Sequence, residues 1–286
     1  MRNQLKNSHP LREPSPCRGT LVMVDGTPHD WFQNGKKFSL HLAIDDSTSE
    51  ILAGYFMPTE CLIGYCHILR QIVINHGIPQ ILYSDKTTII VNHLNDNPTQ
   101  FGRMCKELGI EIIAANSPEA KGKVERMNRT IQNRLLTDIK RNNITSYSQL
   151  NIFFAKKYIK YINHKFSNQP KSEESEFVPL GDVDLTLIFC IKETRPIHSG
   201  AVFSWKGYYY NIIDSNKKII TPYKGTNVTV MEDVFTGKVR VLYKNDIWNT
   251  LKTRNTTRNL EKKKQREIDN QKELDYLLEH RDELSK

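Results

Sequence analysis

The chain has 286 residues, with 41 lysines and arginines against 32 aspartates and glutamates, and a formal net charge of +9. This length allows one large domain or two smaller ones with their own cores, and the positive charge favours a polyanionic partner. No apolar run reaches the roughly 18 residues that span a bilayer, and the start lacks the apolar core of a signal peptide, so we expect a soluble, intracellular protein.

A polar segment begins the chain and leads into an apolar run. Residues 1–20 contain three prolines, so we expect an extended arm rather than a folded unit. The apolar residues 21–24 then predict a short buried strand, which the breakers Gly26 and Pro28 follow closely. Asp25 is therefore expected at the end of this strand.

Two β-rich runs, 38–44 and 50–56, flank a group of turn-forming residues that begins with Asp45 and Asp46. This pattern predicts a β-hairpin. The two adjacent acids resemble a metal-binding pair, but a hairpin turn explains them without a metal. We expect a structural role for both.

Helices and strands alternate in the next part of the chain. Apolar residues recur at helical spacing or form short buried runs, and glycine or proline separates the segments. The expected elements are a helix at 60–75, a strand at 80–85, a helix at 99–109, a strand at 110–116 and a helix from near 119 toward 140. The first of these strands ends at Asp85, and the last helix carries Glu125. The alternation predicts an α/β fold with a mixed sheet.

The chain changes character after one more amphipathic helix, expected at 145–164. These elements form an α/β domain at 21–166. A stretch rich in Ser, Glu and Pro at 167–182 is interpreted as a linker. Short β-rich runs with Gly or Asn turns then predict a small β-barrel-like domain at 183–250. The charged tail, 251–286, has too few apolar residues for a core, so we expect a solvated helix or a disordered arm.

The helix around Glu125 has an unusual charge pattern, because this single carboxylate lies among basic side chains. Such a helix suits a position along a phosphate backbone, with the acid pointing elsewhere. The surrounding basic residues are Lys121, Lys123, Arg126, Arg129 and Arg134.

Three carboxylates follow elements that an α/β domain can bring together. Asp25 and Asp85 end buried strands, and Glu125 lies on the helix after the third strand; sites of open α/β sheets form where strand ends meet one crevice. Acids crowded there repel one another unless a cation offsets their charge. Oxygen ligands favour Mg²⁺ or Mn²⁺, and the five scattered cysteines show no zinc spacing. Two such ions would support in-line displacement at phosphorus.

Several segments resemble a known family. VDGTPHDWF, IDDSTSEILAGYF, LYSDKTTI and the stretch TQFGRMCKELGIEIIAANSPEAKGKVERMNRTIQNRL are similar to the catalytic core of DDE transposases, in particular the ISNCY-type insertion-sequence transposases. The likeness covers about residues 18–165. It implies a retroviral integrase-like, ribonuclease H-like fold, which is a mixed five-stranded sheet flanked by helices, and a β-rich domain after the core.

The resemblance also implies residue roles. Asp25, Asp85 and Glu125 match the three catalytic, metal-binding acids of the family, which hold Mg²⁺ or Mn²⁺, with two ions expected. Asn128 joins the helix residues that such enzymes direct at DNA. The expected DNA-binding residues are Lys121, Lys123, Arg126, Asn128, Arg129 and Arg134.

The expected activity is metal-dependent cleavage of double-stranded DNA at transposon ends, followed by strand transfer into target DNA. Two alternatives stay open: a ribonuclease H-like nuclease without strand transfer, and a catalytically silent DNA-binding remnant that regulates an intact transposase. We expect a homo-oligomer when two ends are synapsed, and a bacterial cytoplasmic location at the nucleoid. Helix-turn-helix domains usually precede such cores, whereas about 20 residues do so here, so weak, sequence-independent DNA binding is expected.

Overall fold

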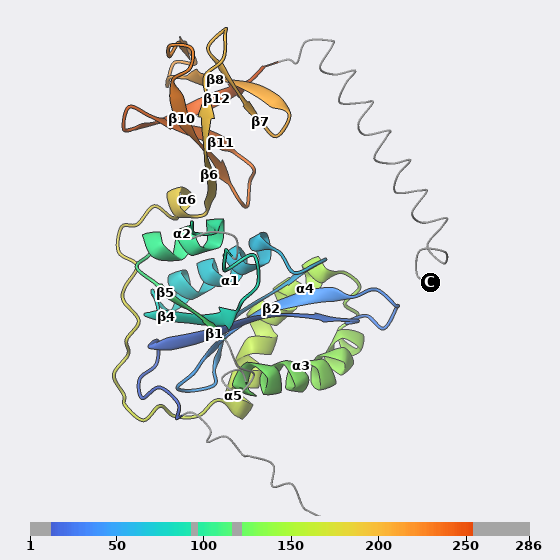
Figure 1. Cartoon of the computed structure of the whole chain (residues 1–286). Coiled ribbons are helices and arrows are strands. Elements are labelled where there is room, and N and C mark those ends of the chain that lie inside the picture. The colour runs from blue at the N-terminus through green and yellow to red at the C-terminus, as the bar shows by residue number, and fades with distance from the viewer. Residues whose placement is uncertain (1–12, 93–96, 116–121, 254–286) are drawn as a thin grey trace, which may run out of the picture. The chain divides into compact units, whose positions relative to one another are not determined.

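The computed structural model describes residues 13–92, 97–115 and 122–253, and it divides into two compact units, Met1–Phe189 and Cys190–Lys286 (Figure 1). Each unit has its own sheet and its own hydrophobic core. Within the described residues, no helix combines the length and the apolar character needed to cross a bilayer.

The first unit is built on a mixed sheet with the strand order β3-β2-β1-β4-β5. Its strands are β1 (Leu21–His29), β2 (Phe38–Asp45), β3 (Ile51–Met57), β4 (Ile81–Asp85) and β5 (Glu111–Ala115). Strands β1, β2 and β3 pair antiparallel, and β4 and β5 continue the sheet parallel to β1. The parallel strands are reached through helical crossovers, as parallel pairing requires. The predicted mixed five-stranded sheet is confirmed.

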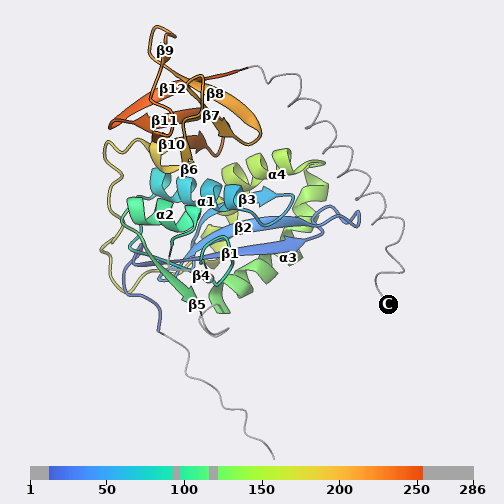
Figure 2. The same cartoon turned by 45° about the horizontal axis from the view of Figure 1, so that its top comes forward.

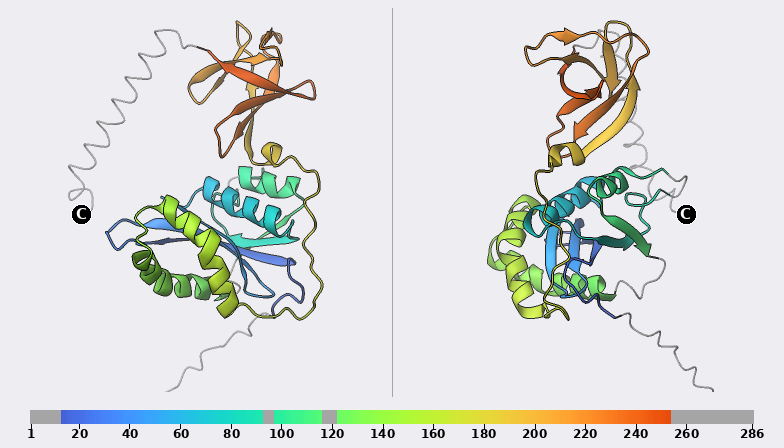
Figure 3. Two further views of the ribbon diagram at one scale, coloured as in Figure 1. Left: turned by 180° about the vertical axis from the view of Figure 1, so that it is seen from behind. Right: turned by 90° about the vertical axis from the view of Figure 1, so that its left-hand side faces the viewer.

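Helices cover both faces of this sheet (Figure 3). They are α1 (Leu62–Asn75), α2 (Gln100–Glu107), α3 (Gly122–Arg141), α4 (Tyr147–Phe153), the π-helical turn η2 (Phe154–Tyr158) and α5 (Ile159–Phe166). Helices α1 and α2 lie on one face, and α3 lies on the other. The single helix expected at 145–164 is formed by α4, η2 and α5 in succession, packed along the edge strand β3.

The main core lies between the sheet and α3. Alternate residues of a strand share one face, and residues three or four apart share one face of a helix, so both patterns direct apolar side chains into the same layer. The core includes Leu21, Met23, Leu40, Leu42 and Ile44 from the strands and Val124, Met127, Ile131, Leu135 and Ile139 from α3. Strand β1 is buried on both faces, because Val22 and Val24, which alternate with Leu21 and Met23, are buried as well.

The stretch interpreted as a linker, 167–182, packs against the first unit. The backbone N–H of Ser172 donates to the carbonyl of Pro16 at 3.0 Å, and that of Glu176 donates to the carbonyl of Arg18 at 2.8 Å. Val178 pairs with Ile78, just before β4. These residues therefore lie beside the end of the N-terminal arm, and their backbone groups are hydrogen-bonded.

The second unit follows a short helix, α6 (Leu185–Ile188), and contains one antiparallel sheet (Figure 2). Its strands are β6 (Cys190–Pro196), β7 (Val202–Trp205), β8 (Tyr208–Ile213), β9 (Ile219–Ile220), β10 (Asn227–Asp233), β11 (Val239–Tyr243) and β12 (Asp246–Lys252). The order is β6-β10-β11-β12-β8-β7, with β9 beside β8. The two end strands, β6 and β7, contact each other, so the sheet is nearly closed and barrel-like. Trp205 is buried in its core.

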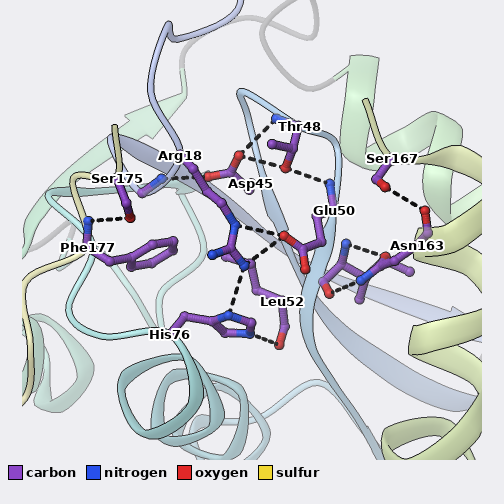
Figure 4. A network of polar contacts seen from close by, with 12 residues as sticks. Arg18, Asp45, Thr48, Glu50, Leu52, His76, Asn163, Ser167, Ser175 and Phe177 are labelled. Atoms are coloured by element: carbon purple, nitrogen blue, oxygen red, sulfur yellow. Dashed lines mark hydrogen bonds and ion pairs between the residues drawn. The ribbon is translucent and has the colours of Figure 1, made fainter. Parts of the chain in front are cut away.

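Two asparagine side chains cover the free backbone edge of β3. Asn163 in α5 accepts from Ile51 N–H at 2.8 Å and donates to the Ile51 carbonyl at 2.9 Å (Figure 4). Asn151 in α4 makes the same pair of contacts with Phe56, at 2.6 and 3.0 Å. A side-chain amide thus replaces a neighbouring strand at both places, which protects an edge that would otherwise be open to pairing.

We predict that Asn163→Ala lowers the free energy of unfolding by about 1–3 kcal/mol, because it leaves a partly buried N–H and carbonyl of β3 without partners. Urea denaturation of the purified chain measures this change. Asn142→Ala is the control, since its amide makes one exposed hydrogen bond to Asp138, and we expect a change below about 0.5 kcal/mol. Equal effects of the two substitutions would contradict the prediction.

Candidate active site

Asp25 and Asp85 lie on adjacent strands of the sheet. Strands β1 and β4 are parallel, and Met23 is registered beside Tyr83; each aspartate lies two residues further along its strand. The sequence placed Asp25 at the end of its strand, but β1 stays paired with β2 as far as His29, so Asp25 lies within the strand, whereas Asp85 is the last residue of β4. Because side chains alternate along a strand, both acids belong to the face on which Met23 and Tyr83 pack toward α3. Asp25 is half-buried and Asp85 is exposed.

Helix α3 contacts Asp25 through Asn128. The Asn128 amide donates to Asp25 Oδ2 at 2.7 Å, and Thr27 Oγ1 donates to the same oxygen at 2.8 Å. Asn128 is only 5% exposed, and its Oδ1 is buried without a hydrogen-bond partner among the described residues. The sequence assigned Asn128 to DNA contact; in the structure its side chain is almost fully buried and hydrogen-bonded to Asp25.

Glu125 lies in the first turn of α3, three residues before Asn128. Residues three apart lie on the same side of a helix, so Glu125 is one turn away from the residue that holds Asp25. Its side chain is exposed. It makes no hydrogen bond or ion pair in the part of the chain that the structure describes.

The three acids approach one edge of the sheet without forming a closed ligand set. Among the described residues, no three His, Cys, Asp or Glu side chains lie close enough together to hold a metal ion. The donor chemistry nevertheless fits a hard divalent cation, because carboxylates and the buried, unpaired amide oxygen of Asn128 are oxygen ligands of the kind that Mg²⁺ prefers. These residues therefore fit such an ion in their chemistry, and their assembly around it stays a prediction.

The predicted DNA-binding residues separate into different environments. Lys121 lies outside the described residues. Lys123 pairs with Asp46 at 3.0 Å, and its side chain is 19% exposed. Arg126 and Arg129 are exposed on α3, and exposed Arg134 lies 5.1 Å from the centre of the Phe166 ring. These three arginines remain accessible to a phosphate backbone.

The opposite side of Asp25 contains groups that the sequence did not single out. A Cβ atom on Gly26 would lie 2.7 Å from Cδ of Glu60, so a larger residue here would have to displace the Glu60 side chain. The Tyr65 hydroxyl donates to Glu60 at 2.7 Å. Burial, and then the charge of Glu60, raise the pKa of Tyr65 far above its usual range. The sequence singled out only Gly26, as a strand breaker, but in the structure it lies within β1 and pairs with His41.

His41 is a buried neutral base beside this strand, opposite Gly26 in the register of β1 and β2. Its Nε2 accepts from the backbone N–H of Cys61 at 3.2 Å, at the start of α1. Burial lowers the pKa of His41 to about 4, although hydrogen bonds with Tyr55 and Cys61 act in the opposite direction. The imidazole therefore links β2 to α1 in its uncharged form.

No family model matches the chain. Two proteins are similar to the chain in sequence. The transposase for insertion sequence IS1202 of Streptococcus pneumoniae is 35% identical over 221 residues, 75% of this chain and 47% of the relative. The inferred transposase y4bF of Sinorhizobium fredii is 34% identical over 213 residues, 72% of this chain and 46% of the relative. The chain spans about half the length of these relatives.

Solved structures of integrase cores are similar to the first half of the fold. The catalytic core domain of BIV integrase has 20% identity and a TM-score of 0.35, covering 49% of this chain and 85% of that one. The HTLV-2 integrase catalytic core, solved with magnesium, has 16% identity and a TM-score of 0.39, covering 48% and 85%.

We predict that replacing Asn128 weakens the support of Asp25. Asn128→Ala should lower the free energy of unfolding by about 1–3 kcal/mol, because a hydrogen bond to a carboxylate is lost. Asn128→Asp should be worse at neutral pH and recover partly at acidic pH, where protonation relieves the repulsion between two carboxylates. Denaturant unfolding at both pH values tests this, with Asn133→Asp on the exposed side of α3 as the control. Identical pH dependence of the two Asp variants would refute it.

We also predict that His41 makes the protein sensitive to acid. The pKa of His41 is about 4 in the folded state against an ordinary value of 6.5, so the unfolded state binds the proton more readily. Its contribution to stability is therefore complete above about pH 6.5 and falls by about 3 kcal/mol as the pH drops toward 4. Unfolding measured between these limits should show a shallower pH dependence in His41→Gln. An unchanged slope would count against this origin.

Proposed function

We propose that this chain, a relative of insertion-sequence transposases over about three quarters of its length, is the catalytic part of such an enzyme and cleaves and joins DNA. The observation that carries the proposal is the arrangement of its three acids. Asp25 and Asp85 lie two residues beyond the registered pair Met23 and Tyr83 on adjacent parallel strands, and Glu125 lies one helical turn from the asparagine that holds Asp25.

Asp25, Asp85 and Glu125 are proposed to hold Mg²⁺ or Mn²⁺, with two ions as the expected number. Bound ions of this kind activate an attacking oxygen and stabilise a leaving oxygen at phosphorus. Asn128 and Thr27 donate to Asp25 and fix the orientation of its carboxylate. Asp85 and Glu125 are exposed, so a DNA strand can approach them directly.

Double-stranded DNA is the proposed substrate. Arg126, Arg129 and Arg134 extend from the exposed side of α3, and their charges suit a phosphate backbone next to the acids. The resemblance adds Lys121 to this set. Two protomers would be needed to hold two DNA ends at once, so the active form is proposed to be a homo-oligomer.

We predict that Asp85→Asn and Glu125→Gln each reduce metal-dependent strand transfer by about 100-fold or more, since loss of one electrostatic stabiliser of a transition state costs about that much. The assay uses the full chain, Mn²⁺ or Mg²⁺, and pre-cleaved DNA ends taken from the terminal repeats that flank the gene. Glu174→Gln, an exposed acid remote from β1 and β4 in the sequence, is the matched control.

Three outcomes of this assay separate the alternatives. Joined products that disappear in the two acid variants support the transposase reaction. When intact ends replace the pre-cleaved ones, cleavage without joining identifies a nuclease that lacks strand transfer. DNA binding without any metal-dependent product from the parent chain would identify a catalytically silent DNA-binding protein.

A further inference from the structure

Asp46 is a buried charge at the turn between β2 and β3. Its side chain is 0% exposed. Oδ2 accepts from the backbone N–H of Ser15 at 2.7 Å and from Ser15 Oγ at 3.0 Å. Lys123 Nζ lies 3.0 Å from Oδ1 and also donates to the main-chain oxygen of Asp46. A carboxylate with no solvent contact requires such a cation, so Lys123 is held by the hairpin turn.

The turn that holds Asp46 is itself tightly bonded (Figure 4). Asp45 accepts from Gly19 N–H and from both the N–H and the hydroxyl of Thr48, each at 2.9 Å. Glu50, at the end of the turn, pairs with Arg18 at 2.7 Å. The turn therefore holds the Asp46 carboxylate in a fixed position, and a fixed group is needed to position another element accurately.

Lys123 connects the turn between β2 and β3 to the proposed active site. It is the second residue of α3, and Glu125 follows two residues later. Lys123 and Asn128 are about 140° apart around the helix axis, at about 100° per residue. The contact of Lys123 with Asp46 and that of Asn128 with Asp25 therefore hold the first turns of α3 from two sides. These contacts oppose rotation of the helix about its axis.

The orientation of Glu125 depends on these two contacts, because its own side chain makes no contact that would orient it. Within the described residues its carboxylate has neither a hydrogen bond nor an ion pair, and it is exposed. Its position is therefore set by the backbone of α3. A rotation of the first turn would move Glu125 away from Asp25 and Asp85 without disturbing the rest of the fold.

We propose that Asp46, acting through Lys123, is a positioning residue that fixes the first turn of α3 and so directs Glu125 toward Asp25 and Asp85. The inference rests on the proposed function for the role of Glu125. It also reassigns Lys123, which the charge pattern placed against DNA: its charge is neutralised by Asp46 and its side chain is largely covered. Arg126, exposed and without an ion-pair partner among the described residues, keeps the DNA-binding role.

The test compares Asp46→Asn, Lys123→Met and the double variant in the full chain. We expect each single variant to weaken Mn²⁺ binding and slow strand transfer by about 10- to 100-fold, as for other residues that support metal ligands. The double variant should be no worse than the worse single one, because both changes remove the same contact. Lys123→Arg, which keeps the charge, should restore most of the activity.

Salt dependence of DNA binding distinguishes positioning from a phosphate contact. In metal-free buffer, Lys123→Met should leave the slope of log affinity against log salt unchanged. Arg126→Gln is the comparison, and it should reduce that slope by about one while Mn²⁺ binding stays intact. If Lys123→Met reduces the slope by about one and binds Mn²⁺ normally, Lys123 is a DNA contact and the proposal is overturned.

Hydrogen exchange provides a readout that does not depend on activity. Backbone amides of 122–128 should exchange faster in Asp46→Asn and Lys123→Met, whereas those of β1 and β4 should not change. If the parent chain neither binds Mn²⁺ nor joins DNA, the proposed function fails, and exchange alone still decides whether Asp46 fixes α3. Unchanged exchange at 122–128 overturns the positioning role. Lys123→Met, altered at a partly exposed side chain, preserves the test if Asp46→Asn does not fold.

Discussion

The packing of α3 across the central strand β1 is the interaction on which the rest of the site depends. Val124 and Met127 enter the core beside Met23, and this apolar contact sets the distance and the rotation of the helix. Asn128, in the following turn, then reaches Asp25 although the two residues are 103 positions apart in the chain. Hydrophobic burial thus holds α3 against the sheet. The hydrogen bond from Asn128 to Asp25 fixes which residues of α3 and β1 lie together.

Burial sorts the acidic residues of this domain into two kinds. Asp45 and Asp46 are 0% exposed and have their charges satisfied by backbone N–H groups, hydroxyls or Lys123. Asp85 and Glu125 are exposed, so water or a bound cation can offset their charges. Acids of the first kind hold the hairpin turn, and those of the second kind stay accessible for chemistry. Asp45 and Asp46 are adjacent in the sequence, like a metal-binding pair, but their hydrogen bonds and ion pair give them the structural role expected of turn residues.

Local patterns predicted most elements of the first unit, because they depend on near neighbours in the chain. The turn at Asp45 and Asp46 and the strand ending at Asp85 are where composition and spacing placed them. The stretch at 167–182 was harder to interpret, since its polar composition favours a linker, yet it is ordered by backbone bonds to residues near Pro16 and Arg18. The asparagine side chains that cover the edge of β3 could not be predicted from the sequence, because Asn163 and Ile51 are 112 residues apart in the chain.

The sequence by itself determined the elements, the mixed α/β class and the three acids, because strand alternation, helical spacing and motif residues are all encoded locally. Only the tertiary structure decided the partners. The basic residues of α3 look equivalent in the sequence, yet Lys123 is bound to a buried carboxylate while Arg126 faces solvent. Asn128 likewise is buried and hydrogen-bonded to Asp25. Such roles depend on which long-range neighbour a side chain meets once the core has formed, and no local pattern specifies that neighbour.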